Sequence, residues 1–455
     1  MTSMTRLARL LAGLALAMLV AAQPAAAQSI LRDAETEAVL NEMSRPLITA
    51  AGLSPANVRM ALINDPSLNA FVAGGQIVYM NSGTIEQAGS ANEVQGVIAH
   101  ELGHIVGGHV PLSDRMFAGA TGISLLSLVL GIAAMAAGSG EAGAGILAAG
   151  QQAAMGKVLA FSRQQEASSD AAGARFLDTA GINGQGMLSF FKRTQAMEYR
   201  YGMDRNRDSF FTTHPMSLDR ITTLQADITA SKAFGRKSDP TLEERFKRVQ
   251  AKLFGFTHEP REVFNKYPDS DQSIYAHYAR AYARHRAGYP AEAAAEAAAL
   301  IKADPDDPYF LELQGQIMLE SGKPREALGP LRRATQLTRS SPLIATLFGH
   351  ALIATDDPTL LPEAERVLRA SVQRDDDNPF AWTQLATVYE RRGDEPRLAL
   401  ANAERFNRTG DPGRALASAR AALAGLPKGS ADWIRAQDIL LVSQTARDDA
   451  RQRRR

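Results

Sequence analysis

Two histidines and a glutamate near residue 100 have the types and spacing found in metal-dependent hydrolases. Residues 100–104 read His-Glu-Leu-Gly-His, and apolar residues recur around them at helical spacing. Residues four apart share one face of a helix, so His100 and His104 can bind one ion while Glu101 points toward its open side. Neutral imidazole suits zinc, and a catalytic zinc site takes three protein ligands. We therefore expect one Zn2+ per chain, with Glu101 taking a proton from water and passing it to the leaving amine.

The third ligand must come from elsewhere in the chain. His109 follows His104 by five residues, one fewer than the H-E-x-x-H-x-x-G-x-x-H pattern requires, so we expect it to be a polar residue near the helix end. Glu166 and Asp170 are four apart in a later helical stretch. Glu166 could bind zinc while Asp170 hydrogen-bonds a ligand imidazole and fixes its tautomer. Without the upstream motif, these two acids would be interpreted as exposed residues of a solvated helix.

The elements that must position these residues predict an α+β domain over residues 28–235. Apolar periodicity predicts a helix over 30–51 and a second helix over 91–109 that carries the motif. Short alternating runs between them predict two or three strands, the last over 76–80 after a Gly-Gly turn. If this last strand forms the sheet edge, an extended substrate could pair with it, which would favour unfolded segments. A buried central strand is the alternative.

Two apolar segments bear on the membrane. Residues 1–27 combine arginines, an apolar run and an Ala-Ala-Ala site, which predicts a cleaved secretory signal rather than an anchor helix. Residues 116–156 carry almost no charge. A single span there would put ligands of one ion on opposite sides of the bilayer, so only zero or two spans are allowed. We expect an apolar helical hairpin that caps the cleft or lies on the membrane surface, and two true spans are the alternative.

The composition excludes several other classes of protein. Cysteine is absent, which rules out disulfides, thiolate metal sites and cysteine nucleophiles. The 50 Lys and Arg against 49 Asp and Glu leave a charge of +1, which gives no electrostatic case for nucleic-acid binding. With 45% hydrophobic and 22% charged residues, the chain can bury a sizeable core. A cysteine-free exported chain fits the periplasm of a Gram-negative bacterium.

The C-terminal half shows a period of about 34 residues. Four small residues mark it at successive spacings of 34, 34 and 37: Ala281, Gly315, Gly349 and Ala386. A period of this length is typical of tetratricopeptide repeats, and an alanine-rich helical bundle is the alternative. We expect an all-α solenoid over 273–446, after a linker over 236–272 with one short helix inside it and before a basic tail over 447–455. Its concave surface would bind proteins or peptides.

The H-E-x-x-H motif, the Glu-x-x-x-Asp pair at 166 and 170, and the Thr-His-Pro run at 213–215 together resemble the gluzincin family of prenyl-protein and heat-shock membrane endopeptidases. Ser169 departs from the pattern, since members usually have alanine before the aspartate. The resemblance implies that His214 lies beside the metal. There it either stabilises the tetrahedral intermediate or occupies the open coordination position in a latent state. Arg220 could anchor the His214 loop to an acid.

Together with the signal and the repeats, the resemblance implies a periplasmic zinc metalloendopeptidase that degrades misfolded or stalled outer-membrane proteins. The repeats would recruit these unfolded or misassembled proteins, or the outer-membrane assembly machinery. Peripheral membrane contact and an integral membrane peptidase both remain open at this point. A rival interpretation is a chaperone-like adaptor whose peptidase domain binds proteins and is latent through His214.

Overall fold

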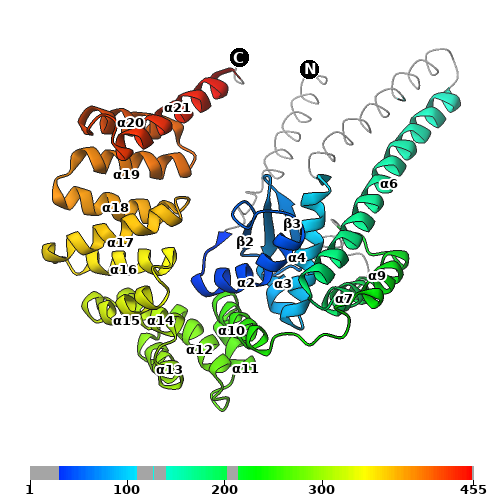
Figure 1. Ribbon diagram of the computed structural model, residues 1–455, viewed down its shortest axis with the longest axis horizontal. Helices are drawn as coiled ribbons and strands as arrows, with labels where there is room; N and C mark the ends of the chain where they lie inside the picture. Colours follow the sequence, from blue (N-terminus) through cyan, green and yellow to red (C-terminus); the bar gives the residue numbers. More distant parts are fainter. Residues whose placement is uncertain (1–29, 110–126, 128–139, 202–213, 453–455) are drawn as a thin grey trace, which may run out of the picture.

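The computed structural model describes residues 30–109, 127, 140–201 and 214–452 (Figure 1). The signal predicted over 1–27 lies outside the described residues. A small sheet surrounded by helices forms one part of the molecule, and a stack of helix pairs forms the other. This architecture is α+β, mainly helical, followed by an all-α solenoid, as the sequence predicted.

Four short strands form one sheet in the order β1-β2-β4-β3. Their bounds are β1 Ile30–Leu31, β2 Arg59–Ile63, β3 Ala70–Ala73 and β4 Ile77–Asn81. β4 runs parallel to β2 and antiparallel to β3. The prediction of an edge strand at 76–80 is therefore wrong, because β4 is paired on both sides. Gly74 and Gly75, with φ of 60° and 97°, fold the chain back and place β3 at the edge.

Among the described residues, six helices come before α10 in this part of the molecule. They are α2 (Ala34–Ala50), α3 (Ser82–Gln87), α4 (Ala91–Val106), α6 (Gly140–Ala180), α7 (Gln185–Tyr201) and α9 (Leu218–Ala230). Apolar side chains of α2, the sheet, α4 and α7 meet in one core, including Leu47, Val78, Ile98 and Phe190. α2 begins later than predicted because Asp33 caps it by accepting a hydrogen bond from the backbone N–H of Thr36.

The apolar region expected to form a hairpin is described only in part. Residues 140–156 belong to α6, a continuous helix of 41 residues that runs on to Glu166. Ser127, helical and described alone in the preceding stretch, lies so close to Gly150 that a Cβ there would come within 2.0 Å of the serine Oγ. Within the described residues, no helix is both long and apolar enough to cross a membrane. The hairpin over 116–156 stays a prediction.

The remainder of the chain is a series of packed helices. They are α10 (Pro240–Thr257), α11 (Pro260–Lys266), α12 (Ile274–Arg286), α13 (Pro290–Ala303), α14 (Pro308–Glu320), α15 (Pro324–Leu337), α16 (Pro342–Ala354), η1 (Pro358–Leu360), α17 (Leu361–Arg374), α18 (Pro379–Arg392), α19 (Glu395–Arg408), α20 (Pro412–Gly425) and α21 (Ala431–Gln452). The small residues of the period lie where helices of a pair touch, since a Cβ on Gly315 or Gly349 would come within 2.6 Å of a leucine in the next helix.

Two boundaries differ from those expected. The stretch 236–272 is not a linker with one short helix, because it holds α10 and α11. α10 is amphipathic, and Phe246 and Leu253 on its apolar side enter the core of the part that contains the sheet. The tail expected over 447–455 is helical as far as Gln452, as a continuation of α21.

The start of α2 connects the two parts of the molecule. The Glu35 carboxylate is buried and accepts a hydrogen bond of 2.6 Å from the Tyr278 hydroxyl of α12. Arg248 of α10 lies 2.7 Å from the same carboxylate, and Nζ of Lys252 lies 2.5 Å from Asp33. These contacts join α2 to α10 through ion pairs and to α12 through the Tyr278 hydroxyl, so the start of α2 is held against both α10 and the repeats.

Candidate active site

The helix that carries the H-E-x-x-H motif is fixed in position along most of its length. Ser90 caps α4 by accepting a hydrogen bond from the backbone N–H of Glu93, and residues 91–103 are all buried. A Cβ on Gly96 would lie 2.4 Å from Cα of Met187, so glycine is what allows α7 to pack directly on this helix.

Glycines also bring α6 against the metal-binding helix. A Cβ on Gly103 would lie 2.7 Å from the Ser169 carbonyl oxygen, and one on Gly173 would lie 3.1 Å from the backbone of Ala99. Glu166 precedes Ser169 by one turn on α6. The close approach of the two backbones therefore holds the Glu166 carboxylate against the histidines of α4. These glycines were not singled out from the sequence, because only the packing of the two helices shows why they matter.

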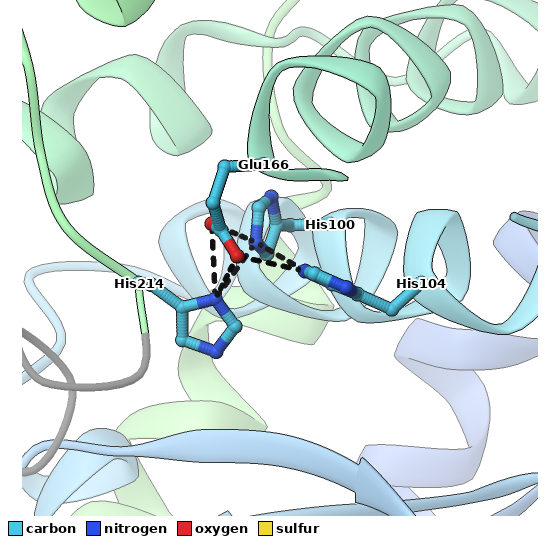
Figure 2. A group of neighbouring side chains, drawn as sticks. All are labelled: His100, His104, Glu166 and His214. Carbon is cyan, nitrogen blue, oxygen red and sulfur yellow. Dashed lines mark hydrogen bonds and ion pairs between the residues drawn. The ribbon is translucent and has the colours of Figure 1, made fainter. Parts of the chain in front are cut away.

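Four side chains from three segments converge on one point: His100 and His104 of α4, Glu166 of α6 and His214 before α9 (Figure 2). One potential ligand atom from each lies within 4.8 Å of all the others. The Nε2 atoms of His100 and His104 are 3.1 Å apart, and Nδ1 of His214 is 3.1 Å from both Glu166 oxygens. Sequence spacing had predicted His100, His104 and Glu166 as ligands of one ion. The family resemblance had implied that His214 lies beside them.

The chemistry of this donor set fits a zinc ion. Three imidazoles and one carboxylate are ligands that zinc accepts, and their donor atoms face one another with no hydrocarbon between them. The electrostatics of the group differ between its two α4 histidines. Burial opposes charge on His100, but Asp170 and Glu166 outweigh it and raise its pKa to about 10. Burial and the charge on His100 lower the pKa of His104 to about 2.

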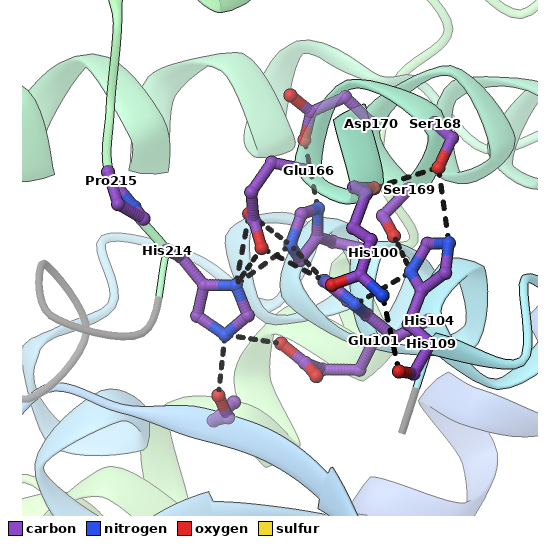
Figure 3. A network of polar contacts seen from close by, with 12 residues as sticks. His100, Glu101, His104, His109, Glu166, Ser168, Ser169, Asp170, His214 and Pro215 are labelled. Atoms are coloured by element: carbon purple, nitrogen blue, oxygen red, sulfur yellow. Dashed lines mark hydrogen bonds and ion pairs between the residues drawn. The ribbon is translucent and has the colours of Figure 1, made fainter. Parts of the chain in front are cut away.

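Glu101 lies beside the cluster without touching its centre (Figure 3). Both carboxylate oxygens are buried, and neither has a hydrogen-bond partner among the described residues. Oε1 is 3.5 Å from Nε2 of His214. Burial raises the pKa of Glu101, although the neighbouring histidines oppose this. A buried carboxylate without a partner is costly in a core but suits a group that must take up a proton.

Asp170 and Arg220 support the cluster from behind. Oδ1 of Asp170 lies 2.9 Å from Nδ1 of His100, which leaves Nε2 of that ring facing the other ligands. Arg220 donates two hydrogen bonds to Asp170, at 2.7 and 2.9 Å, and a third of 2.7 Å to the carbonyl of Pro215. This single guanidinium therefore joins α6 to the segment that carries His214.

His214 stands between the cluster and the edge of the sheet. Its Nδ1 faces Glu166, and its Nε2 lies 3.2 Å from the carbonyl oxygen of Ala70 on β3. Ala70 was not identified from the sequence, because a backbone carbonyl leaves no trace in residue type. His109, weighed as a ligand, lies outside the four-residue group and on the far side of His104.

An H-E-x-x-H helix with a glutamate from a following helix and a small sheet defines a metallopeptidase of the gluzincin class. Residues 31–228 match peptidase family M48 and form a peptidase domain of that family. Together with the four-residue group, this match establishes that the chain is a zinc metallopeptidase.

The chain is similar to curated proteins over most of its length. It is 23% identical over 406 residues to the beta-barrel assembly-enhancing protease of Escherichia coli (strain K12), covering 86% of this chain and 79% of the relative. The Yersinia pestis protein of the same name is 23% identical over 415 residues, covering 86% and 81%. Metalloprotease LoiP of Escherichia coli (strain K12) is 27% identical over 179 residues, covering 39% and 64%. Among solved structures, the crystal structure of the P58(IPK) TPR domain aligns at 14% identity over 78% of this chain and 99% of that chain, with a TM-score of 0.17 that is too low to bear on the fold.

Proposed function

We propose that this chain is a periplasmic zinc metalloendopeptidase that cleaves misfolded or stalled outer-membrane proteins. The observation that carries the proposal is the convergence of His100, His104 and Glu166 beside the buried carboxylate of Glu101, which has no hydrogen-bond partner among the described residues. The substrate class and the location are supported by similarity to a protease whose name refers to β-barrel assembly. They are supported as well by the signal that the first 27 residues predict.

Each residue of the site has a role in this proposal. His100, His104 and Glu166 bind the zinc, which when bound lowers the pKa of water and polarises a peptide carbonyl. Glu101 takes the proton from the attacking water and delivers it to the leaving amine. Asp170 keeps the proton of His100 on Nδ1, at 2.9 Å, so that Nε2 can bind the metal. Arg220 holds Asp170 in place.

The edge strand β3 would present the substrate. Among the described residues it pairs with β4 alone, so the backbone groups on its other side are available to an extended peptide. Pairing through the backbone tolerates any sequence but requires an unfolded segment. Such selection suits the removal of misfolded chains.

His214 makes the enzyme latent in this proposal. It contacts the Ala70 carbonyl at 3.2 Å and Glu101 at 3.5 Å, where substrate and water would otherwise lie. A substrate strand pairing at Ala70 would compete with His214 for the same oxygen. After displacement, the imidazole would be close enough to stabilise the tetrahedral intermediate, so the two roles follow one another.

The experiment that tests the enzyme is zinc content and casein cleavage of the purified mature chain. Wild type is compared with Glu101→Gln and His214→Ala, and with His350→Ala as a histidine control in the repeats. We expect one zinc per chain throughout, loss of cleavage in Glu101→Gln, and faster cleavage in His214→Ala. Zinc-free protein, or equal cleavage by all four proteins, would contradict the catalytic assignment.

A second candidate function is a chaperone-like adaptor, which the position of His214 within the metal group favours. The two functions differ in cells. If Glu101→Gln fully restores outer-membrane protein assembly to a strain lacking this protein, the adaptor is correct, and a defect supports the peptidase. The repeats would recruit substrates or the assembly machinery in either case, and photo-crosslinking from the repeats would identify these partners. Extraction of the mature chain by carbonate would exclude an integral membrane peptidase.

A further inference from the structure

His109 lies at the end of the metal-binding helix and contacts a proposed ligand directly. Its Nδ1 is 2.9 Å from Nδ1 of His104, and its Nε2 is 3.2 Å from the hydroxyl oxygen of Ser168 on α6 (Figure 3). The Nε2 atom of His104 points the other way, toward His100 and Glu166. His109 therefore touches the face of His104 that is turned away from the metal group.

The donors and acceptors along this chain of contacts allow one consistent arrangement. When Nε2 of His104 binds a cation, its Nδ1 carries the proton and must donate. Nδ1 of His109 is then the acceptor, so the proton of that ring is on Nε2 and is donated to Ser168. The Ser168 hydroxyl in turn donates a hydrogen bond of 2.9 Å to the Gln165 carbonyl oxygen. Every donor and acceptor in this series of contacts therefore has a partner.

The same residue also joins the two helices that supply the ligands. The side-chain amide of Gln165 donates a hydrogen bond of 3.2 Å to the carbonyl oxygen of His109. Oγ of Ser169 lies 3.2 Å from Nδ1 of His109. Gly107 leaves room for the ring, because a Cβ there would lie 2.3 Å from its Nε2. The His109 side chain is thus fixed from both α4 and α6.

We propose that His109 is a positioning residue for the zinc ligand His104. It accepts the Nδ1 proton of His104 and so fixes the tautomer and ring orientation in which Nε2 faces the metal. Asp170 does the same for His100 with a carboxylate, whereas His109 does it with a neutral ring and adds no negative charge to the site. The inference depends on the assignment of His104 as a ligand.

The test measures zinc affinity by competition with a chromophoric chelator, together with the visible absorption of the cobalt-substituted protein. His109→Ala removes the acceptor, and we expect zinc affinity to fall 10- to 100-fold. The Oδ1 atom of asparagine occupies nearly the place of Nδ1, so His109→Asn should recover most of the affinity. Glutamine reaches the place of Nε2 instead, so His109→Gln should recover little. Cobalt absorption should change in His109→Ala and return in His109→Asn.

A matched variant separates positioning from a folding defect. Ser168→Ala alters an exposed side chain and removes the acceptor for Nε2 of His109 together with the hydrogen bond to the Gln165 carbonyl, so zinc affinity should fall by a few-fold. Zinc affinity and cobalt absorption in His109→Ala equal to those of wild type, or recovery by glutamine rather than asparagine, would overturn the proposal.

His104→Ala distinguishes a failure of this inference from a failure of the ligand assignment. If His104→Ala binds zinc as tightly as wild type, His104 is not a ligand, and both the ligand assignment and the positioning role of His109 are wrong. If it loses zinc while His109→Ala keeps it, only the positioning role is wrong. Circular dichroism of each metal-free variant shows whether the fold is intact.

Discussion

The Nε2 atoms of His100 and His104 lie only 3.1 Å apart, so in the absence of a cation their lone pairs require a proton between them. His100 is the ring that carries it. Asp170 and Glu166 raise the pKa of His100 to about 10 against the effect of burial, and burial with the charge on His100 lowers the pKa of His104 to about 2. The metal-free site therefore holds a proton where the metal would bind.

Zinc binding should release about one proton per chain at pH 7.5, because His100 must be neutral to act as a ligand. Since its pKa is about 10, zinc affinity should rise roughly tenfold for each pH unit from pH 7 toward that value. Calorimetry in buffers of different ionisation enthalpy measures the released proton. A heat of binding that does not depend on the buffer would contradict the assignment.

Gly103→Ala should separate the two helices that supply the ligands. The new Cβ would come within 2.7 Å of the Ser169 carbonyl oxygen, which cannot move without shifting α6 and Glu166. We expect a loss of about 2 kcal/mol in stability and at least tenfold weaker zinc binding. Gly329→Ala is the control, since a Cβ on that helical glycine meets nothing within 4 Å and should stabilise α15 slightly. Equal zinc affinity in both variants would show that the close approach of the helices is unimportant.

Arg220→Met should destabilise the peptidase part strongly. The side chains of Arg220 and Asp170 are both about 5% exposed, so removing the guanidinium takes two hydrogen bonds from a buried carboxylate and leaves it paired with His100. We expect a loss of about 3 kcal/mol, measured by urea unfolding. Arg414→Met breaks an exposed ion pair with Asp411 and should cost less than about 1 kcal/mol. Similar losses in the two variants would disprove the importance of burial.

Glu312→Gln should stabilise the protein at high pH. Burial raises the pKa of Glu312 to about 8 although Lys252 opposes this, and its Oε2 has no hydrogen-bond partner among the described residues. A carboxyl with a raised pKa in the folded state contributes stability that is complete below its ordinary pKa of 4.5 and is lost as pH rises through 8.

Glutamine cannot ionise, so Glu312→Gln should match wild type at pH 5 and be more stable by about 2 to 4 kcal/mol at pH 9. Urea midpoints at the two pH values measure this difference. Glu390→Gln, at an exposed position, is the matched control. A Glu312→Gln effect that is the same at both pH values would point to packing instead of ionisation.

Local spacing in the sequence predicted the motif helix and the helical stack. Glu166 was predicted as the third ligand because a carboxylate pair four apart is visible in the sequence, and the structure places it beside His100 and His104. The edge strand was not predicted, because strand order depends on pairing between distant residues. The contact of His214 with Ala70 was not predicted for the same reason, because the two residues are 144 apart in the sequence. The length of α10 and its packing on the core were not predicted, because a polar surface hid its apolar stripe.

The start of α2 and a residue just before it contact groups that lie much later in the chain. Glu35 meets Tyr278, 243 residues later, and Arg32 meets Asp375, 343 residues later. α2 also packs against the helix that holds the zinc ligands. Contacts between residues so far apart form late in folding. A chain cut short before its repeats would lack the Tyr278 hydroxyl and the Asp375 carboxylate, so the start of α2 gains these two partners only when the repeats are present.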